Sequence, residues 1–188
     1  MASGAERRLY WWVAVSALLL DLATKFLAER YLFRSAGHSV FGDWFQLRLV
    51  YNPGAAFGLH LGPYSRWIFM VIAIGAVVLL YRYHRNAERG DWFRQLALGL
   101  VTGGAIGNLV DRIRSTQGVV DFLDLGVGSW RWPTFNVADM AVSCGAVLLA
   151  ISLWREDARR EAAQALPGRP LPPENTPPEP AVSGPRDE

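Results

Sequence analysis

Two aspartates in apolar surroundings are the residues of this chain best suited to chemistry. Asp121 lies within the sequence VVDFL, and Asp139 is the only charged residue between Trp132 and Trp154. Burial raises the pKa of a carboxyl group, and a buried acid without a cation is stabilised by sharing a proton with a second acid. In such a pair the ionised acid activates water, while the protonated acid hydrogen-bonds to the carbonyl oxygen under attack. The residue types therefore predict a hydrolase with an Asp121–Asp139 dyad.

The same aspartates are also compatible with a transport protein. An ionisable side chain inside a membrane span costs about 2.5 to 3.5 kcal/mol on insertion scales, so it calls for a partner or a task. Asp21, Asp121 and Asp139 could relay ions or protons across a bundle. From the residues alone, a dyad hydrolase is only slightly favoured over a small ion- or proton-coupled transport or assembly protein.

Other chemistries find little support in the sequence. His38, His60 and His84 are scattered and no His-Glu-x-x-His pattern occurs, so we expect no metal and no cofactor. Cys144, the single cysteine, lies among apolar residues, where a thiol behaves as a small hydrophobe. No basic stretch with interleaved aromatic residues is present, which argues against a nucleic-acid partner.

Four long apolar stretches must position the aspartates. A helix needs about 17 to 25 mostly apolar residues to cross a bilayer. Stretches of this kind run at about 9–28, 63–81, 95–112 and 133–154, and Asp139 lies about two turns into the last. We therefore predict an all-α membrane protein with four transmembrane helices. Arginine is slightly more frequent at the span ends that lie on the same side as the two termini than at the opposite ends. This bias predicts that both termini are cytoplasmic.

The segment after the first span is too rich in β-branched and aromatic residues for a simple linker. Residues 40–51 alternate in part, and Asn52-Pro53-Gly54 is typical of a turn. We predict a small extracytoplasmic β element at about 38–60, between helices 1 and 2. Residues 1–160 would form the membrane-embedded domain, and the Pro-rich residues 161–188 a disordered cytoplasmic tail.

Several further polar residues need partners. Asp21 and Lys25 are four residues apart on one helical face and predict an internal ion pair. At the end of the third span, Asp111 is expected to be a structural partner of Arg112. Asp124 follows Asp121 in a segment that looks more exposed, which makes it the weaker catalytic candidate.

Glycines of the third span recur on one helical face. Gly99, Gly103 and Gly107 are spaced by four, and Gly104 lies beside them. Small residues at this spacing let a neighbouring helix approach closely, so we expect a packing role.

Five sequence blocks, in order, resemble the bacterial lipoprotein signal peptidase (signal peptidase II) family. The blocks are Asp21-Leu-Ala-Thr24-Lys25, Asn52-Pro-Gly54-Ala-Ala-Phe57-Gly58, Gly103-Gly104-Ala-Ile-Gly107-Asn108-Leu-Val-Asp111-Arg112, Val120-Asp121-Phe122 and Trp132-Pro133-Thr-Phe135-Asn136-Val-Ala138-Asp139. Any one block is a weak signal, whereas five in this order on four predicted spans are specific.

The resemblance implies a membrane aspartic peptidase with Asp121 and Asp139 as its dyad. It implies cleavage of prolipoproteins just before a diacylglyceryl-modified cysteine, in the bacterial cytoplasmic (inner) membrane, and sensitivity to globomycin. We expect a monomer in contact with membrane lipid. The residues expected to bind substrate or support the site are Asp21, Lys25, Asn52, Gly54, Gly104, Asn108, Arg112, Asn136 and Ala138.

Overall fold

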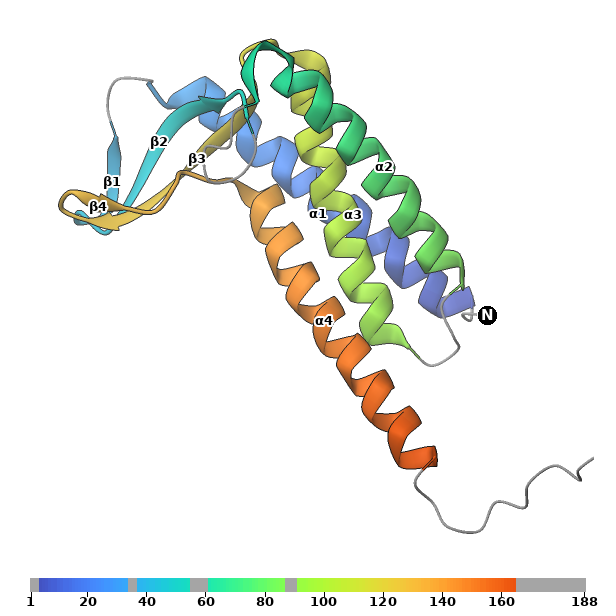
Figure 1. Ribbon diagram of the computed structural model, residues 1–188. Helices are drawn as coiled ribbons and strands as arrows, with labels where there is room; N and C mark the ends of the chain where they lie inside the picture. Colours follow the sequence, from blue (N-terminus) through green and yellow to red (C-terminus); the bar gives the residue numbers. More distant parts are fainter. Residues whose placement is uncertain (1–3, 34–36, 55–60, 87–90, 165–188) are drawn as a thin grey trace, which may run out of the picture. The chain divides into compact units, whose positions relative to one another are not determined.

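Four long helices dominate the computed structural model, which describes residues 4–33, 37–54, 61–86 and 91–164 (Figure 1). They are α1 (Gly4–Tyr31), α2 (Ser65–Asn86, preceded by a 3-10 turn, η2, at Gly62–Tyr64), α3 (Trp92–Arg114) and α4 (Val137–Gln164). Each is long and apolar enough to cross a membrane, which confirms the predicted fold class. The predicted 161–188 tail begins within α4, and its residues 165–188 lie outside the described residues.

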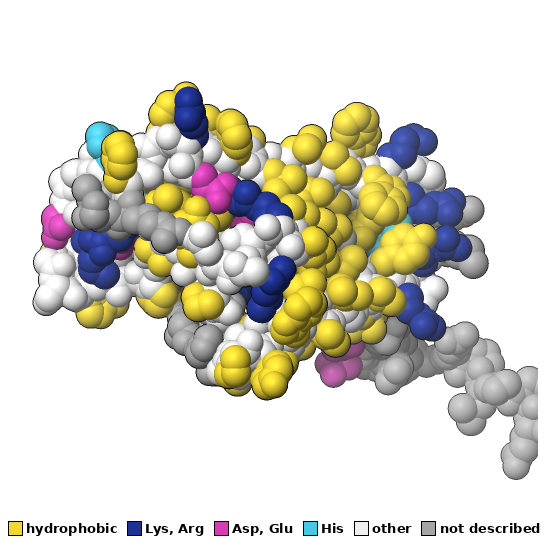
Figure 2. Space-filling view, turned by 90° about the horizontal axis from the view of Figure 1, so that it is seen from above, with side chains coloured by type: hydrophobic (Ala, Val, Ile, Leu, Met, Phe, Trp, Pro, Cys, Tyr) yellow, Lys and Arg dark blue, Asp and Glu magenta, His cyan; other side chains and the backbone are white. Residues whose placement is uncertain are grey.

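The surface of the helices is strongly apolar. Hydrophobic side chains cover much of the face shown in Figure 2, and the large exposed ones on α2 include Val71, Ile72, Val78 and Leu79. In water such a surface would favour aggregation, whereas in a bilayer it faces lipid chains of similar polarity. The apolar side chains thus point outward because the lipid chains of the bilayer surround these helices.

A four-stranded antiparallel sheet adjoins the helices. Its strands are β1 (His38–Phe41), β2 (Phe45–Asn52), β3 (Val119–Val127) and β4 (Trp130–Arg131), in the order β1-β2-β3-β4. The β element expected between helices 1 and 2 is confirmed at β1 and β2, while residues 55–60 of its range lie outside the described residues.

Two of the four strands come from the segment between α3 and α4, where the sequence predicts no strand. β3 is buried at most of its positions, so it lacks the alternation of a half-exposed strand. It pairs with β2 such that Val50 lies opposite Asp121 and Asn52 lies opposite Val119. This register brings the predicted Asn52 turn beside Asp121.

The start of α4 differs from the prediction and moves Asp139. The helix begins at Val137, not near residue 133, so Asp139 lies in its first turn and not two turns inside. The reason is that the residues before it run extended along β3. Phe135 N–H donates to Leu123 O at 3.0 Å, and Leu123 N–H donates back to Phe135 O at 2.8 Å.

The glycines of α3 are confirmed as packing residues. A Cβ at Gly103 would collide with the Ala14 carbonyl of α1, and one at Gly104 would lie 2.5 Å from the Ala138 carbonyl oxygen of α4. Gly107 lies against the carboxylate of Asp21. Bare backbone on two faces of α3 therefore lets α1 and α4 approach closely.

We predict that Gly104→Ala lowers the thermal unfolding midpoint of the purified protein relative to Gly75→Ala. Overpacking a helix contact costs about 1 to 3 kcal/mol. Gly75, within α2, has nothing within 4 Å of an added Cβ, so it controls for the helix propensity of alanine. Equal midpoints for the two variants would contradict the close α3–α4 contact.

Candidate active site

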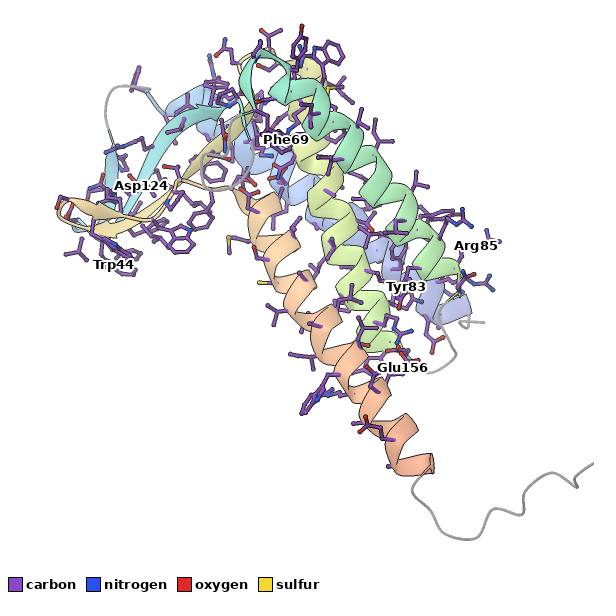
Figure 3. The ribbon with its side chains drawn as sticks, in the orientation of Figure 1. Trp44, Phe69, Tyr83, Arg85, Asp124 and Glu156 are labelled. Carbon is purple, nitrogen blue, oxygen red and sulfur yellow. The ribbon has the colours of Figure 1, made fainter. Side chains whose placement is uncertain are left out.

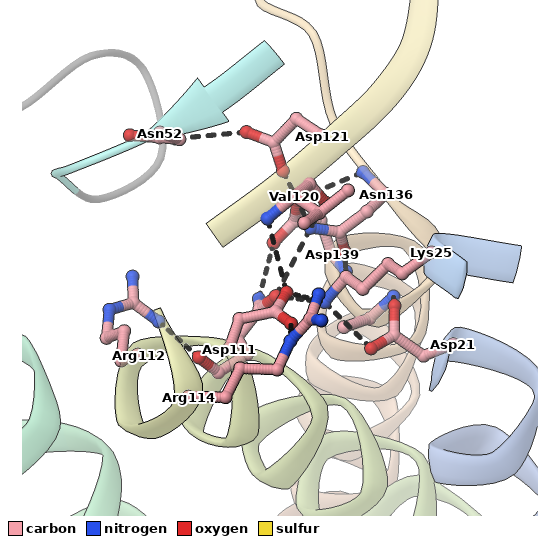
Figure 4. Close-up of polar contacts among 12 residues, drawn as sticks. Asp21, Lys25, Asn52, Asp111, Arg112, Arg114, Val120, Asp121, Asn136 and Asp139 are labelled. Atoms are coloured by element: carbon pink, nitrogen blue, oxygen red, sulfur yellow. Dashed lines mark hydrogen bonds and ion pairs between the residues drawn. The ribbon is translucent and has the colours of Figure 1, made fainter. Parts of the chain in front are cut away.

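The structure brings the two predicted catalytic aspartates to one cavity of about 390 Å³. Asp121 comes from β3 and Asp139 from the first turn of α4 (Figure 4). Asp121 is 2% exposed, whereas Asp139 is partly exposed. Besides the dyad, the lining includes the polar residues Asn52, Asn108 and Arg112 and the apolar residues Trp132, Phe135 and Met140.

Asp121 is surrounded by neutral donors. Asn52 Nδ2 donates to its Oδ2 at 3.1 Å, and Asn136 Nδ2 donates to its Oδ1 at 2.7 Å. The pKa of Asp121 is raised to about 7, mainly by burial and further by the neighbouring Asp139. The two amides and Lys25 lower this pKa but do not offset the rise. Desolvation and the second acid together outweigh the donors, so Asp121 is suited to hold a proton near neutral pH.

Asp139 occupies an environment that favours its negative charge. It forms a reciprocal cap with Asn136: Asp139 N–H donates to Asn136 Oδ1 at 2.9 Å, and Asn136 N–H donates to Asp139 Oδ2 at 3.2 Å. Asn108 Nδ2 donates to its Oδ1 at 2.8 Å. The positive end of the α4 dipole also favours an anion in this first turn. The two acids of the cavity therefore differ in their surroundings.

Three asparagines point their amide nitrogens at this pair because their oxygens are held by groups that only donate. Asn52 Oδ1 accepts from Gly54 N–H at 3.0 Å, and Asn136 Oδ1 accepts from the Asp139 N–H. Asn108 Oδ1 accepts from Lys25 Nζ at 3.0 Å. A backbone N–H or an ammonium cannot accept, so each amide has one favourable orientation.

A buried cluster of ion pairs, formed by Lys25, Asp21 and Asp111, supports the backbone next to both aspartates. Lys25 Nζ lies 2.8 Å from Asp21 Oδ2, which confirms the predicted pair, and 2.9 Å from Asp111 Oδ2. Asp21 Oδ1 accepts from Ala138 N–H at 2.8 Å, and Asp111 Oδ2 accepts from Val120 N–H at 3.2 Å. Each carboxylate thus holds the backbone immediately before one of the two candidate catalytic aspartates, and Lys25 joins the two carboxylates.

Asp111 has the structural role expected of it, but its arginine partner is not Arg112. Asp111 Oδ1 lies 2.9 Å from Arg114 Nε, three residues along α3. The Arg112 guanidinium turns instead toward two carbonyls: it donates to Gly54 O at 3.0 Å and to Asn108 O at 3.1 Å. It also lies 5.7 Å from the ring centre of Phe69, which Figure 3 labels on α2. The i, i+3 spacing of Asp111 and Arg114 is the signal in the sequence that indicates this pair.

Asp124 is buried, contrary to the expected exposure. It is 2% exposed and lies 2.7 Å from Arg131 Nε, and Figure 3 shows it on the sheet. An acid held by an arginine is a structural residue, so its lower rank as a catalytic candidate stands for a different reason. Among the described residues, no group of three or more His, Cys, Asp or Glu is placed to hold a metal ion.

Replacing Asp139 by Asn should lower the pKa of Asp121 from about 7, because the charge of Asp139 contributes to that raised value. Titration of a ¹³C-labelled aspartate carboxyl by NMR measures the change. Asp124→Asn, on the same strand, should leave the value unchanged. An unchanged pKa in Asp139→Asn would show that the two acids do not interact.

The comparisons with known proteins agree with one another. The family model described as Signal peptidase (SPase) II matches residues 13–155. A lipoprotein signal peptidase of Burkholderia mallei is 41% identical over 143 residues, covering 73% of this chain and 84% of the relative. One from Paraburkholderia phymatum is 41% identical over 146 residues, covering 76% and 86%.

Solved structures of two bacterial membrane enzymes, obtained by the in meso method, share the fold. The one at 2.3 Å resolution has a TM-score of 0.72 and 26% identity, covering 85% of this chain and 93% of its own. The one at 1.9 Å has a TM-score of 0.68 and 28% identity, covering 77% and 91%. With the family model, these matches show that the chain is a multi-pass membrane protein and belongs to the signal peptidase II family of aspartic peptidases.

Proposed function

We propose that this chain removes signal peptides from prolipoproteins with an Asp121–Asp139 dyad, cleaving just before a diacylglyceryl-modified cysteine. The observation that carries the proposal is the meeting of two unlike acids in one cavity: Asp121 buried among neutral amides, and Asp139 capping the start of α4. The relatives named lipoprotein signal peptidase support the substrate class.

The surroundings of the two acids support different roles for them in peptide hydrolysis. Asp139, with both oxygens accepting N–H groups at a helix N-terminus, is the ionised member that removes a proton from water. The hydroxyl oxygen attacks the carbonyl carbon, and Asp121 donates its proton to the carbonyl oxygen. As the tetrahedral intermediate collapses, that proton returns to Asp121, and Asp139 passes its proton to the departing nitrogen. The C–N bond breaks to give a carboxylic acid and an amine.

The position of the dyad fits a substrate that arrives within the membrane. Asp139 lies in the first turn of α4, and Arg112 lies in the last turn of α3. The cavity combines these polar groups with apolar residues, such as Trp132 and Met140, suited to a signal helix and lipid chains. We infer a monomer in the cytoplasmic membrane, with both termini cytoplasmic, which places the dyad at the outer side. We also expect inhibition by globomycin.

The contacts of the spans disfavour a transport protein with relay aspartates. Asp21 would have to bind and release a cation, yet one of its oxygens is paired with Lys25 and the other accepts a backbone N–H. A carboxylate engaged in this way holds structure. A peptidase requires no such exchange.

Asp121→Asn and Asp139→Asn should each lower the rate of prolipoprotein cleavage by about 10² to 10⁴-fold, because each removes a proton-transfer group. The assay uses the purified full-length chain and a lipid-modified substrate, with Asp124→Asn as the control on β3. The assignment of the dyad fails if either folded variant cleaves at the wild-type rate.

The rate should fall as the pH rises through about 7, because Asp121 must be protonated to act as the acid. The hydrogen bond from Asn52 lowers the pKa of Asp121, so its removal should raise this pKa and move the fall in rate to higher pH. The pH dependence of kcat for wild type and Asn52→Ala measures both effects. A fall that moves to lower pH in Asn52→Ala would assign the protonated role to another group.

A further inference from the structure

The ammonium group of Lys25 is enclosed beside the dyad, although the proposed proton transfers give it no step. The side chain is 1% exposed. Its Nζ lies 2.8 Å from Asp21, 2.9 Å from Asp111 and 3.0 Å from Asn108 Oδ1. An ammonium has three N–H donors and no acceptor, so all three of these oxygens face a group that can only donate.

Asn108 connects this ammonium to Asp139. With its oxygen turned toward Lys25, its Nδ2 lies 2.8 Å from Asp139 Oδ1. Asn136 Nδ2 also donates to the same Asn108 oxygen, at 3.2 Å. The reversed amide would set NH₂ against two donors and oxygen against a carboxylate, and all three contacts would become repulsive. The ammonium therefore selects the orientation that donates to Asp139.

We propose that Lys25 is a positioning residue for the peptidase reaction, acting through the Asn108 amide to hold the Asp139 carboxylate in place as an anion. The inference rests on the proposed function of the dyad. Lys25 does not belong to the described residues that line the cavity, whereas Asn108 and Asp139 do. Its effect on the rate must therefore pass through another residue.

Lys25 could affect the rate by a second route, which has to be distinguished from the route through Asn108. Lys25 also joins Asp21 and Asp111, which hold the backbone N–H groups of Ala138 and Val120. Through these contacts Lys25 could act by stability alone. Both routes predict that loss of the ammonium destabilises the protein. Only the Asn108 route predicts that the loss of rate depends on an amide at position 108.

A double-mutant cycle in the full-length protein separates the two routes. The four proteins are wild type, Lys25→Met, Asn108→Ala and the double variant, each assayed for kcat and KM with a lipid-modified prolipoprotein. Lys25→Met should lower kcat by about 10 to 100-fold, the size of effect known for residues that orient the ligands of a metal ion without touching the metal. KM should change little. In the Asn108→Ala background, the same substitution should cost less than about threefold.

Equal losses of kcat in the two backgrounds, or wild-type kcat in Lys25→Met, would overturn the inference. Should Lys25→Met fail to fold, Lys25→Gln keeps hydrogen bonding but can present either end of its amide, so it tests the same coupling. Arg94→Met is the matched control, since Arg94 is a buried cation 2.9 Å from Asp91 at the other end of α3. It should lower the unfolding midpoint without lowering kcat. An inactive Asp139→Asn variant, together with additive losses, would reject the Lys25 role alone and leave the dyad standing.

Discussion

The direction of hydrogen bonding is the constraint on which this site depends. An asparagine side chain can be turned either way at little cost unless its partners can only donate or only accept. Around Asp121 and Asp139 the oxygens of Asn52, Asn108 and Asn136 face two backbone N–H groups and one ammonium. The three NH₂ groups are thereby all directed at the aspartates. Two acids that would otherwise repel each other are held by fixed neutral donors.

The buried charges beside Asp121 and Asp139 hold a strand and a helix at a defined separation. Isolated charges are costly inside a protein, and they persist when they are paired and hydrogen-bonded. Lys25 joins Asp21 and Asp111, and these accept the N–H groups of Ala138 and Val120. Those are the residues immediately before Asp139 and Asp121. One cation on α1 is therefore linked to the backbone on both sides of the site.

Packing at α3 makes these short polar contacts possible. Gly103 and Gly104 allow α1 and α4 to approach α3 at backbone distance, and Gly107 leaves room for the Asp21 carboxylate. A side chain at any of these glycines would move the helix that carries a polar partner. The bare face of α3 and the ion-pair cluster are thus parts of one arrangement.

By itself the sequence determined the four spans and the Asp21–Lys25 pair, because hydropathy and i, i+4 spacing act locally. It also singled out Asp121 and Asp139 as the candidate dyad. It also indicated the family, through five short blocks in order. Local patterns failed where partners are distant in the chain: β3 pairs with β2, Asp111 binds Lys25 and Arg114, and Asp124 is buried against Arg131. Only the tertiary structure placed Asp139 in the first turn of α4, since the backbone pairing of Phe135 with Leu123 delays the helix. It alone decided which way each asparagine turns, because that choice depends on donors brought together from α1, α3 and the sheet.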